Sequence, residues 1–346
     1  MRRSAPLAAL PGLLMCVASC DRAAPPAPGE ELPVRVERAV FLMGTLASFV
    51  AEAVDRETGL ARLERMVRVI EDTEAELSTW RNDSVLSAVN RQPTGEPLPA
   101  PPAVCGLLTR LADWRESTGG AFDPAVGSLI DAWGLRAEGR RPDDAALEAA
   151  MAVSGLGHLA VETDPCVITR RAAVMLDAGG FGKGEALERV REAERDRPGA
   201  WLIDFGGQVA VSGAAAGGAW PVAVAHPTRR DAPVLDLLLA SGSLATSGGS
   251  ERDLILEDGG RIGHVIDPRT GRTVARAASV TVWHEDALAA DVLSTALYVM
   301  GAEAGIAWAE AGGITACFIV AAPGSGDVAY RATSAFEARF PLPPPA

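Results

Sequence analysis

The second half of the chain restricts the fold more than any other feature, because it is a run of short strand-like segments separated by brief turns. Starting at residue 200, these segments read AWLIDFGG, QVAVSG, WPVAVAHP, VLDLLLAS and SLATSG. Each is apolar or alternating and is bounded by turn-forming residues, which is typical of strands. Strands that meander late in the chain, after a region in which strands and helices are mixed, favour an α+β fold over a doubly wound parallel sheet.

Helical patterns dominate the first half. Residues 56–77 place their apolar residues on one helical face, and a polar loop then leads into a short helix for which Asp83 or Ser84 is the expected N-cap. The sequence further predicts strands over 34–54 and 174–180, a short helical stretch that ends at Gly134, and helices over 104–118, 143–153, 185–195 and 287–300.

The N-terminus has the pattern of a targeting segment. Two arginines precede a mostly apolar stretch over residues 5–18, which is shorter than the ~20 residues of a membrane-spanning helix. It ends in VASC, which resembles a bacterial lipobox with Cys20 as the lipidated residue. We therefore expect a signal peptide over 1–19, a Pro/Ala-rich tether over 20–34 and one domain over 35–340. A plain secretory signal cleaved at the same place is the alternative.

The charge of the chain argues against nucleic-acid binding, and its cysteine spacing argues against a zinc site. The net charge of −13 opposes binding to a nucleic-acid backbone, and the sequence has no basic patch. Cys105, Cys166 and Cys317 have no C-x-x-C spacing and no nearby histidine, so a zinc site is not supported. A disulfide between two of them and buried free thiols both remain open at this stage.

Lys183 is the only lysine of the chain, whereas every other basic residue is arginine. It lies in LDAGGFGKGEAL, a glycine-rich turn between a predicted strand and a predicted helix. Such a turn offers backbone N–H groups and a positive helix end to an anion such as a phosphate. The segment is not a Walker A loop, because Asp177 and Gly184 stand where Gly and Ser/Thr are needed, and it lacks the Rossmann spacing. A purely structural turn is the alternative.

Asp291 and Thr295 are four residues apart on a predicted helix and therefore share one face. A carboxylate and a hydroxyl at this spacing suit a hard cation such as Mg²⁺, which prefers oxygen ligands. The alternative is that Asp291 stabilises the helix dipole and Thr295 bonds to its own backbone.

Three further residues are candidates by type and position. Asp123 lies in a turn after Phe122, and Trp80 lies in a polar loop where an aromatic ring either packs or stacks on a flat heterocycle. His264, between a strand and a turn, is a candidate acid or base, although a single histidine is also often structural.

The order of these motifs along the chain resembles the ApbE family, the FAD:protein FMN transferases. The matching blocks, from about residue 38 to about 322, are MGT, LSTWRNDSVLSAVN, GAFDPAVGSLIDAWG, LDAGGFGKG, IDFGGQVAVSG, LATSGGSER, HVIDPRTG and SVTVWHEDALAADVLSTALYVMG. The resemblance implies a mixed sheet flanked by helices in two closely packed subdomains. It also implies Mg²⁺-dependent transfer of FMN from FAD to a Ser/Thr hydroxyl of a partner protein through a phosphoester bond, with release of AMP.

The same resemblance implies roles for individual residues. His264 would be the general base and would also contact FAD. The remaining FAD contacts would be Met43, Trp80, Ala121, Phe122, Asp123, Asp177 and Lys183, and the metal ligands would be Gly180 through its carbonyl, Asp291 and Thr295. The family's usual lipoprotein character implies anchoring through Cys20 on the periplasmic side of the bacterial inner membrane. Acceptors would be redox subunits of the quinone-reductase type.

The chain departs from the family pattern at Ser250, where an aromatic residue is usual, which affects acceptor contacts more than FAD binding. Trp80 stands where tyrosine is also common. Alternative functions are an FAD pyrophosphatase, a flavin carrier without turnover, and a serine hydrolase that would use Ser247 with Asp267 and His284.

Overall fold

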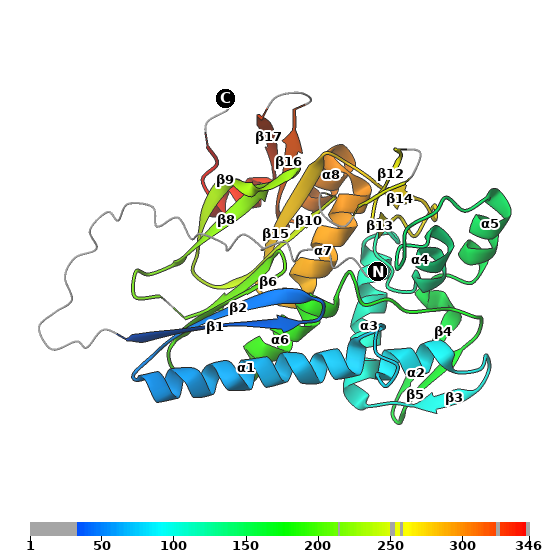
Figure 1. Cartoon of the computed structure of the whole chain (residues 1–346), viewed down its shortest axis with the longest axis horizontal. Coiled ribbons are helices and arrows are strands. Elements are labelled where there is room, and N and C mark those ends of the chain that lie inside the picture. Colours follow the sequence, from blue (N-terminus) through cyan, green and yellow to red (C-terminus); the bar gives the residue numbers. More distant parts are fainter. Residues whose placement is uncertain (1–32, 214, 250–252, 257–258, 323–325, 344–346) are drawn as a thin grey trace, which may run out of the picture. The chain divides into compact units, whose positions relative to one another are not determined.

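An eight-stranded antiparallel sheet forms the centre of the protein (Figure 1). The computed structural model describes residues 33–213, 215–249, 253–256, 259–322 and 326–343, so the predicted signal peptide, Cys20 and Ser250 lie outside the described residues. All neighbouring strands of this sheet pair antiparallel. In spatial order they are β1 (Val34–Leu42), β2 (Thr45–Ala53), β6 (Ala200–Phe205), β7 (Gln208–Ser212), β10 (Gly242–Gly248), β15 (Ala278–His284), β16 (Thr315–Ala321) and β17 (Val328–Ala332).

The strands of this sheet follow chain order, and the other elements are insertions between them. Between β2 and β6 come α1 (Arg56–Leu77), α2 (Val85–Arg91), β3 (Pro97–Pro99), α3 (Pro102–Ser117), α4 (Gly127–Trp133), α5 (Asp144–Ala152), a 3₁₀ turn (Leu156–His158), β4 (Leu159–Thr163), β5 (Cys166–Arg170) and α6 (Gly182–Ala193). Later come the hairpins β8 (Trp220–His226) with β9 (Arg229–Leu239), β11 (Leu254–Ile255) with β12 (Arg261–Ile262), and β13 (Val265–Ile266) with β14 (Thr273–Val274), then α7 (Ala287–Met300), α8 (Ala302–Ala311) and, after β17, α9 (Ser334–Arg339).

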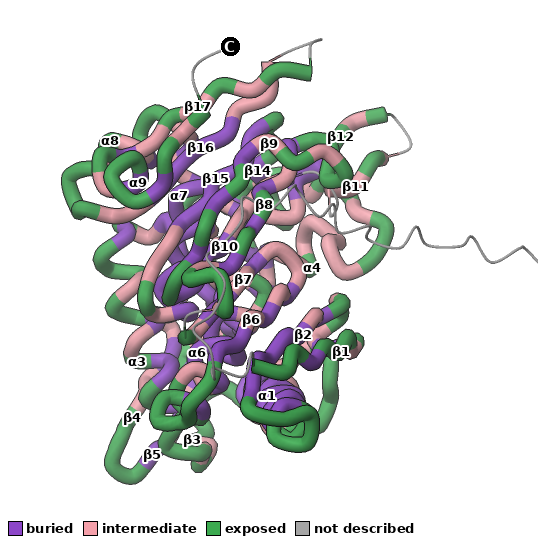
Figure 2. Tube along the Cα trace, turned by 90° about the vertical axis from the view of Figure 1, so that its left-hand side faces the viewer, coloured by how far each residue is buried: buried purple, intermediate pink, exposed green. Residues whose placement is uncertain are grey.

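Helices including α1, α6 and α7 cover one face of the large sheet, and the β8–β9 hairpin together with α9 covers the other. α1 packs on β1 and β2, and α7 packs on β10 and β15. Because side chains alternate between the faces of a strand, β2 contributes to two separate cores. Phe49 belongs to the buried cluster of α1 and α6, whereas Val50 belongs to that of β8 and β9. In Figure 2 the buried residues follow these central strands and the inner sides of the helices.

The α+β prediction is confirmed, and the chain from residue 33 onward forms one compact unit in which two subdomains are not separated. The helices α2–α5 and the small β3–β5–β4 sheet lie to one side of the large sheet in Figure 1. Within the described part of the chain, no helix is both long and apolar enough to cross a bilayer.

Local signals placed most helices correctly, but two predictions at the glycine-rich segment are wrong. α1 spans the predicted 56–77, and the Ser84 hydroxyl caps α2 by accepting a hydrogen bond from the Ser87 N–H. In contrast, residues 174–180 form no strand, because the side-chain amide of Asn90 bonds both the N–H and the C=O of Leu176 in place of a neighbouring strand. α6 begins at Gly182 instead of residue 185, so Lys183 lies in its first turn.

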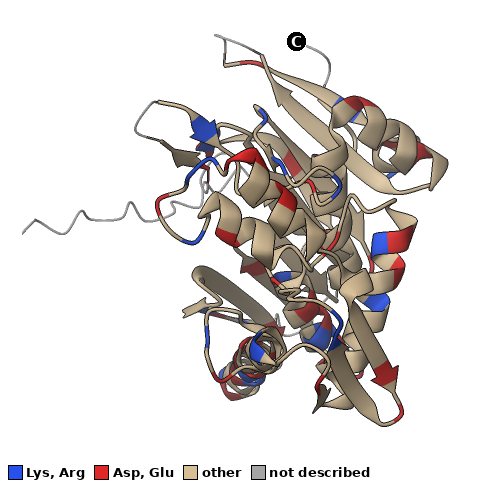
Figure 3. Cartoon of the chain, turned by 90° about the vertical axis from the view of Figure 1, so that its right-hand side faces the viewer, with Lys and Arg blue, Asp and Glu red and all other residues tan. Residues whose placement is uncertain are grey.

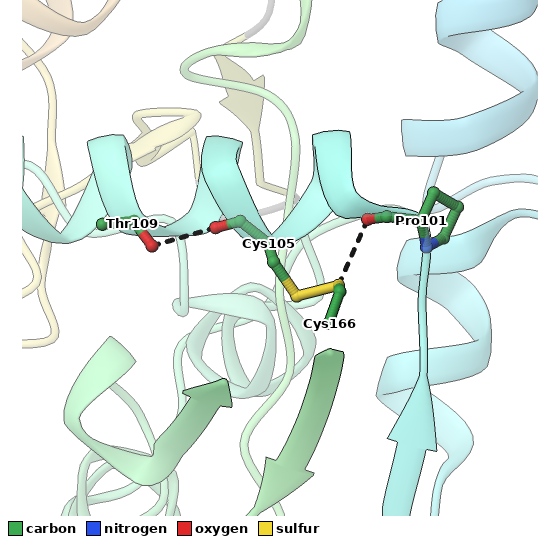
Figure 4. The surroundings of a disulfide bond; sticks show 4 residues. All are labelled: Pro101, Cys105, Thr109 and Cys166. Carbon is green, nitrogen blue, oxygen red and sulfur yellow. Dashed lines mark hydrogen bonds between the residues drawn. A yellow bond between two sulfur atoms is a disulfide. The ribbon is translucent and has the colours of Figure 1, made fainter. Parts of the chain in front are cut away.

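A disulfide fastens α3 to the small sheet (Figure 4). It joins Cys105 in α3 to Cys166 in β5, which are 61 residues apart in sequence. The Cys166 sulfur also lies 3.2 Å from the carbonyl oxygen of Pro101, at the start of α3. The structure therefore selects one of the pairings that the sequence left open. Cys317 is a buried free cysteine, and burial, aided by the charge of Glu337, raises the pKa of its thiol to about 12.

Candidate active site

The first turn of α6 meets the middle of α7 at Lys183 and Asp291. The ammonium nitrogen of Lys183 lies 3.5 Å from Oδ1 of Asp291, and Oδ2 of Asp291 accepts a hydrogen bond from the Gly184 N–H at 2.9 Å. Only 18% of the Lys183 side chain and 6% of the Asp291 side chain are exposed. The free N–H groups and positive end of a helix stabilise a negative charge. Asp291 of α7 therefore contacts both the Lys183 ammonium group and a backbone N–H in the first turn of α6.

Gly184 permits the close approach of the two helices. A Cβ atom at this position would lie 2.7 Å from the carbonyl oxygen of Ala287 and 2.7 Å from Cβ of Asp291. Both distances are shorter than real Cβ contacts, so any side chain would push α6 away from α7. This glycine of the GKG sequence is therefore required by helix packing.

Thr295 lies one turn beyond Asp291 on α7 and faces Gly180. A Cβ built on Gly180 would stand 3.5 Å from Oγ1 of Thr295 and 3.5 Å from a ring carbon of Phe122. Phe122 and the adjacent Ala121 are themselves buried. The fold therefore brings together four predicted site residues from three distant parts of the sequence, and it places a hydroxyl beside the backbone of the glycine-rich segment.

The β1–β2 turn places Met43 beside the same helix terminus. A Cβ at Gly182 would lie 3.2 Å from the terminal methyl of Met43. The Met43 N–H donates to Oε2 of Glu74 in α1 at 3.0 Å, and Met43 has a φ of 46°, followed by Gly44 at 76°. A left-handed backbone at a residue other than glycine costs roughly 1–3 kcal/mol and is often found at functional positions. The bond to Glu74 helps to hold Met43 in this conformation.

Asp177 belongs to a polar cluster that reaches Trp80. Its Oδ2 accepts from Nη2 of Arg136 at 2.7 Å and from the Thr79 hydroxyl at 3.4 Å, while its Oδ1 accepts from the Gly179 N–H. The Arg136 guanidinium lies over the Trp80 ring, 5.3 Å from its centroid, and Trp80 is 73% exposed. The exposed indole is thus held by a cation–π contact. Sequence analysis missed Arg136, which carries no local motif.

Asp123, which is among the predicted FAD contacts, is hydrogen-bonded within the protein. Its buried carboxylate pairs with Nε of Arg115 at 2.6 Å and accepts from the N–H groups of Ala125 and Leu156. These bonds fasten the turn after α3 to the 3₁₀ turn that precedes β4. In the structure, the carboxylate of Asp123 is therefore used to hold the loop that carries Phe122.

His264 lies between β12 and β13 and is hydrogen-bonded to a residue that sequence analysis did not consider. Its Nδ1 is 3.0 Å from Oδ1 of Asp253, which also accepts from the backbone N–H of His264 at 3.1 Å. The His264 side chain is 28% exposed and that of Asp253 is 2% exposed. The two residues are eleven positions apart in the sequence, where nothing indicates that they pair, and the β11–β12 hairpin brings them together.

The alternative hydrolase triad is wrong. Ser247 lies within β10 and shares a hydrogen bond with the Ser294 hydroxyl, and Asp267 pairs with Arg269. His284 lies opposite Ser243, four residues along β10 from Ser247, which is about 13 Å at ~3.3 Å per strand residue. Ser247 therefore has no adjacent imidazole from His284.

Arginine side chains hold helices together near the site. Glu185 in α6 pairs with Arg110 of α3 and with Arg189 one turn along α6. Burial raises the pKa of Glu185, and these arginines offset only part of that effect. On the side of the molecule shown in Figure 3, basic residues are interspersed with acidic ones.

The fold and site define an α+β protein in which a helix N-terminus, one ammonium group, a carboxylate and a hydroxyl lie close together. The ApbE family model matches residues 43–318. The chain is 31% identical to the FAD:protein FMN transferase of Klebsiella pneumoniae, covering 86% of this chain and 87% of the relative. It is 30% identical to the FAD:protein FMN transferase of Vibrio cholerae, covering 73% and 77%.

Solved structures give the same result. The apo flavinyl transferase ApbE of Pseudomonas stutzeri matches with a TM-score of 0.79 at 27% identity, covering 90% of this chain and 98% of that one. The ApbE protein of Thermotoga maritima matches with a TM-score of 0.80 at 27% identity, covering 89% and 99%. The chain belongs to the ApbE family.

Proposed function

We propose that this protein transfers FMN from FAD to a Ser or Thr hydroxyl of a partner protein. The hydroxyl oxygen attacks the FMN-side phosphorus of the pyrophosphate, forming a phosphoester bond. The bond from that phosphorus to the bridging oxygen breaks, and AMP leaves with the electron pair. The hydroxyl proton passes to His264. The similarity to two FAD:protein FMN transferases supports this reaction class.

The observation that carries the proposal is the contact of Lys183 with Asp291 at the N-terminus of α6. The pyrophosphate of FAD is doubly anionic, and an acidic chain has to supply local positive charge to hold it. Lys183 is a compact, strongly hydrated point charge suited to a phosphate, whereas the planar fork of arginine has a different shape. We assign the pyrophosphate to this helix terminus and the flavin side of FAD to Met43 and Trp80.

The ligand set beside Lys183 fits Mg²⁺. The described residues contain no cluster of three or more His, Cys, Asp or Glu that could hold a metal. A cation here would therefore take one carboxylate from Asp291 together with neutral oxygens from Thr295 and Gly180. Mg²⁺ is usually bound by one or two carboxylates, waters and substrate phosphates. When bound, it would polarise the phosphoryl oxygens and neutralise charge on the departing AMP.

The cellular setting is also a proposal. We place the protein on the periplasmic side of the inner membrane, anchored through a lipid on Cys20, with redox subunits of the quinone-reductase type as acceptors. The VASC sequence supports the anchor. Labelling cells with a radioactive or clickable fatty acid tests it, since a Cys20→Ser variant would lose the label.

The transfer is tested by incubating the purified protein with FAD, Mg²⁺ and an acceptor subunit. We expect flavin fluorescence to remain on the acceptor in a denaturing gel, one AMP to form per flavin transferred, and EDTA to abolish both. AMP and free FMN without labelled acceptor would favour the pyrophosphatase. Absence of AMP, together with no FAD binding, would overturn the proposal.

A further inference from the structure

The carboxylate of Asp253 contacts His264 twice, and these contacts determine which ring nitrogen of His264 carries the proton. One oxygen, Oδ1, accepts from the backbone N–H of His264 and lies 3.0 Å from its Nδ1. An ionised carboxylate only accepts hydrogen bonds, so Nδ1 has to carry the proton. In the neutral ring the lone pair is then on Nε2, which has no hydrogen-bond partner among the described residues.

Asp253 is itself held rigidly. Its second oxygen accepts from Nε of Arg261 at 2.8 Å, and Nη2 of the same arginine donates to the carbonyl of Gly249 at 2.6 Å. A Cβ at Gly249 would lie 2.8 Å from Oδ2 of Asp253 and 2.7 Å from the hydroxyl of Tyr298. The absence of a side chain at 249 therefore leaves the space that the Asp253 carboxylate occupies.

The ionised form of Asp253 is favoured despite its burial. Burial raises the pKa of its carboxyl, but the hydrogen bonds from His264 and Arg261 outweigh burial, and the pKa lies below its ordinary value. A buried charge is costly unless it is paired and hydrogen-bonded. Both Asp253 oxygens have such partners.

The pair lies beside the helix that carries the candidate metal ligands. Asp291, Thr295 and Tyr298 follow one another at spacings of four and three residues on α7, and hence on one face. Tyr298 lies against Gly249, which is next to Asp253. α7 therefore connects the Lys183–Asp291 contact with the Asp253–His264 pair.

We propose that Asp253 is the positioning residue of the transfer reaction, which holds His264 with Nδ1 protonated so that Nε2 takes the acceptor hydroxyl proton. This inference rests on the proposed function, in which His264 is the base. The orientation of a catalytic histidine by a buried aspartate follows the same logic as in serine hydrolases. After proton uptake, the carboxylate stabilises the imidazolium that forms.

The first test needs no activity. The chain has four histidines, so a spectrum of ¹⁵N-histidine-labelled protein is simple, and the His264→Ala variant identifies the His264 signals. At alkaline pH we expect the wild-type ring in the Nδ1–H form and the Asp253→Asn ring shifted toward the Nε2–H form. An Nε2–H ring in the wild type would overturn the proposal even if FMN transfer were confirmed.

The second test measures the reaction. Asp253→Asn is expected to lower kcat for transfer by about 10²–10⁴-fold, the range of a general base, with the KM for FAD unchanged. Asp253→Glu, which keeps a carboxylate, is expected to recover part of this loss. Asp236→Asn, at an exposed position of β9, removes the same charge and is expected to leave kcat unchanged.

A double variant separates the proposed role from a merely structural one. If Asp253 acts through His264, Asp253→Asn combined with His264→Ala is no slower than His264→Ala alone. Multiplicative losses, or a wild-type kcat for Asp253→Asn, would contradict the proposal. If the wild type transferred no FMN while the ring had the Nδ1–H form, the proposed function would fail and the positioning of His264 by Asp253 would stand.

Discussion

The contact between α6 and α7 predicts that the Gly184→Ala substitution damages both stability and turnover. The added methyl would lie 2.7 Å from the Ala287 carbonyl oxygen, 2.7 Å from Cβ of Asp291 and 2.9 Å from Cα of Leu288. Ordinary contacts are about 3.5 Å, so the helices have to separate by about 0.8 Å. Two of the three atoms belong to the α7 backbone, and no side-chain rotation relieves them.

The magnitude follows from two opposing effects. Overpacking a tight contact costs about 1–3 kcal/mol, and the better helix propensity of alanine offsets up to about 1 kcal/mol of this cost. We therefore expect the free energy of unfolding to fall by about 1–2 kcal/mol. The same shift stretches the 2.9 Å bond from the Gly184 N–H to Asp291 and displaces Lys183, so FAD affinity and AMP release should fall as well.

Gly106→Ala is a matched control. Gly106 is also helical, in α3, but a Cβ there meets no atom within 4 Å. This substitution is expected to stabilise the protein by about 0.4–1 kcal/mol and leave turnover unchanged. Urea unfolding of the two variants and the wild type measures both values. Equal shifts of the midpoint in the two variants would refute the packing argument.

Three other predictions follow from the site and the cysteines. Lys183→Ala and Asp291→Ala should each reduce AMP release strongly while the protein remains folded, as urea unfolding would show. Because Lys183 is the only lysine, FAD should also protect it from an amine-directed acylating reagent, and equal labelling with and without FAD would contradict the pyrophosphate assignment. Reduction of Cys105–Cys166, which closes a 61-residue separation, should lower the free energy of unfolding by about 4 kcal/mol in the chain-entropy model, as measured by urea unfolding with and without dithiothreitol. Cys317, whose pKa is about 12 because of burial, should remain unlabelled by iodoacetamide at pH 8 until the protein is unfolded, as peptide mass spectrometry would show.

The turn at Met43 contacts both α1, which Trp80 follows in the sequence, and the first turn of α6. Glu74, near the end of α1, bonds the Met43 N–H, and Trp80 follows the helix by three residues. Met43 in turn lies next to Gly182. In the proposed function, the indole ring held by Arg136 would bind the flat flavin, and the N-terminus of α6 would bind the anionic pyrophosphate.

The sequence by itself determined the elements whose causes are local. The apolar face of α1, the Ser84 cap of α2 and the left-handed Gly134 at the end of α4 all depend on residues within a few positions of one another. The meander of late strands indicated the α+β class for the same reason. The order of the short motifs indicated the family and a set of site residues, because those residues occur within the motifs.

Only the tertiary structure decided how distant segments pair. Nothing near Leu176 predicts that Asn90 replaces a neighbouring strand, and nothing near His264 indicates Asp253 as its partner. The same holds for the Cys105–Cys166 bond, since three cysteines without motif spacing allow every pairing. These features depend on contacts between residues 11 to 86 positions apart. Such contacts form when the large sheet and its helices pack together, and the local pattern of the sequence does not predict them.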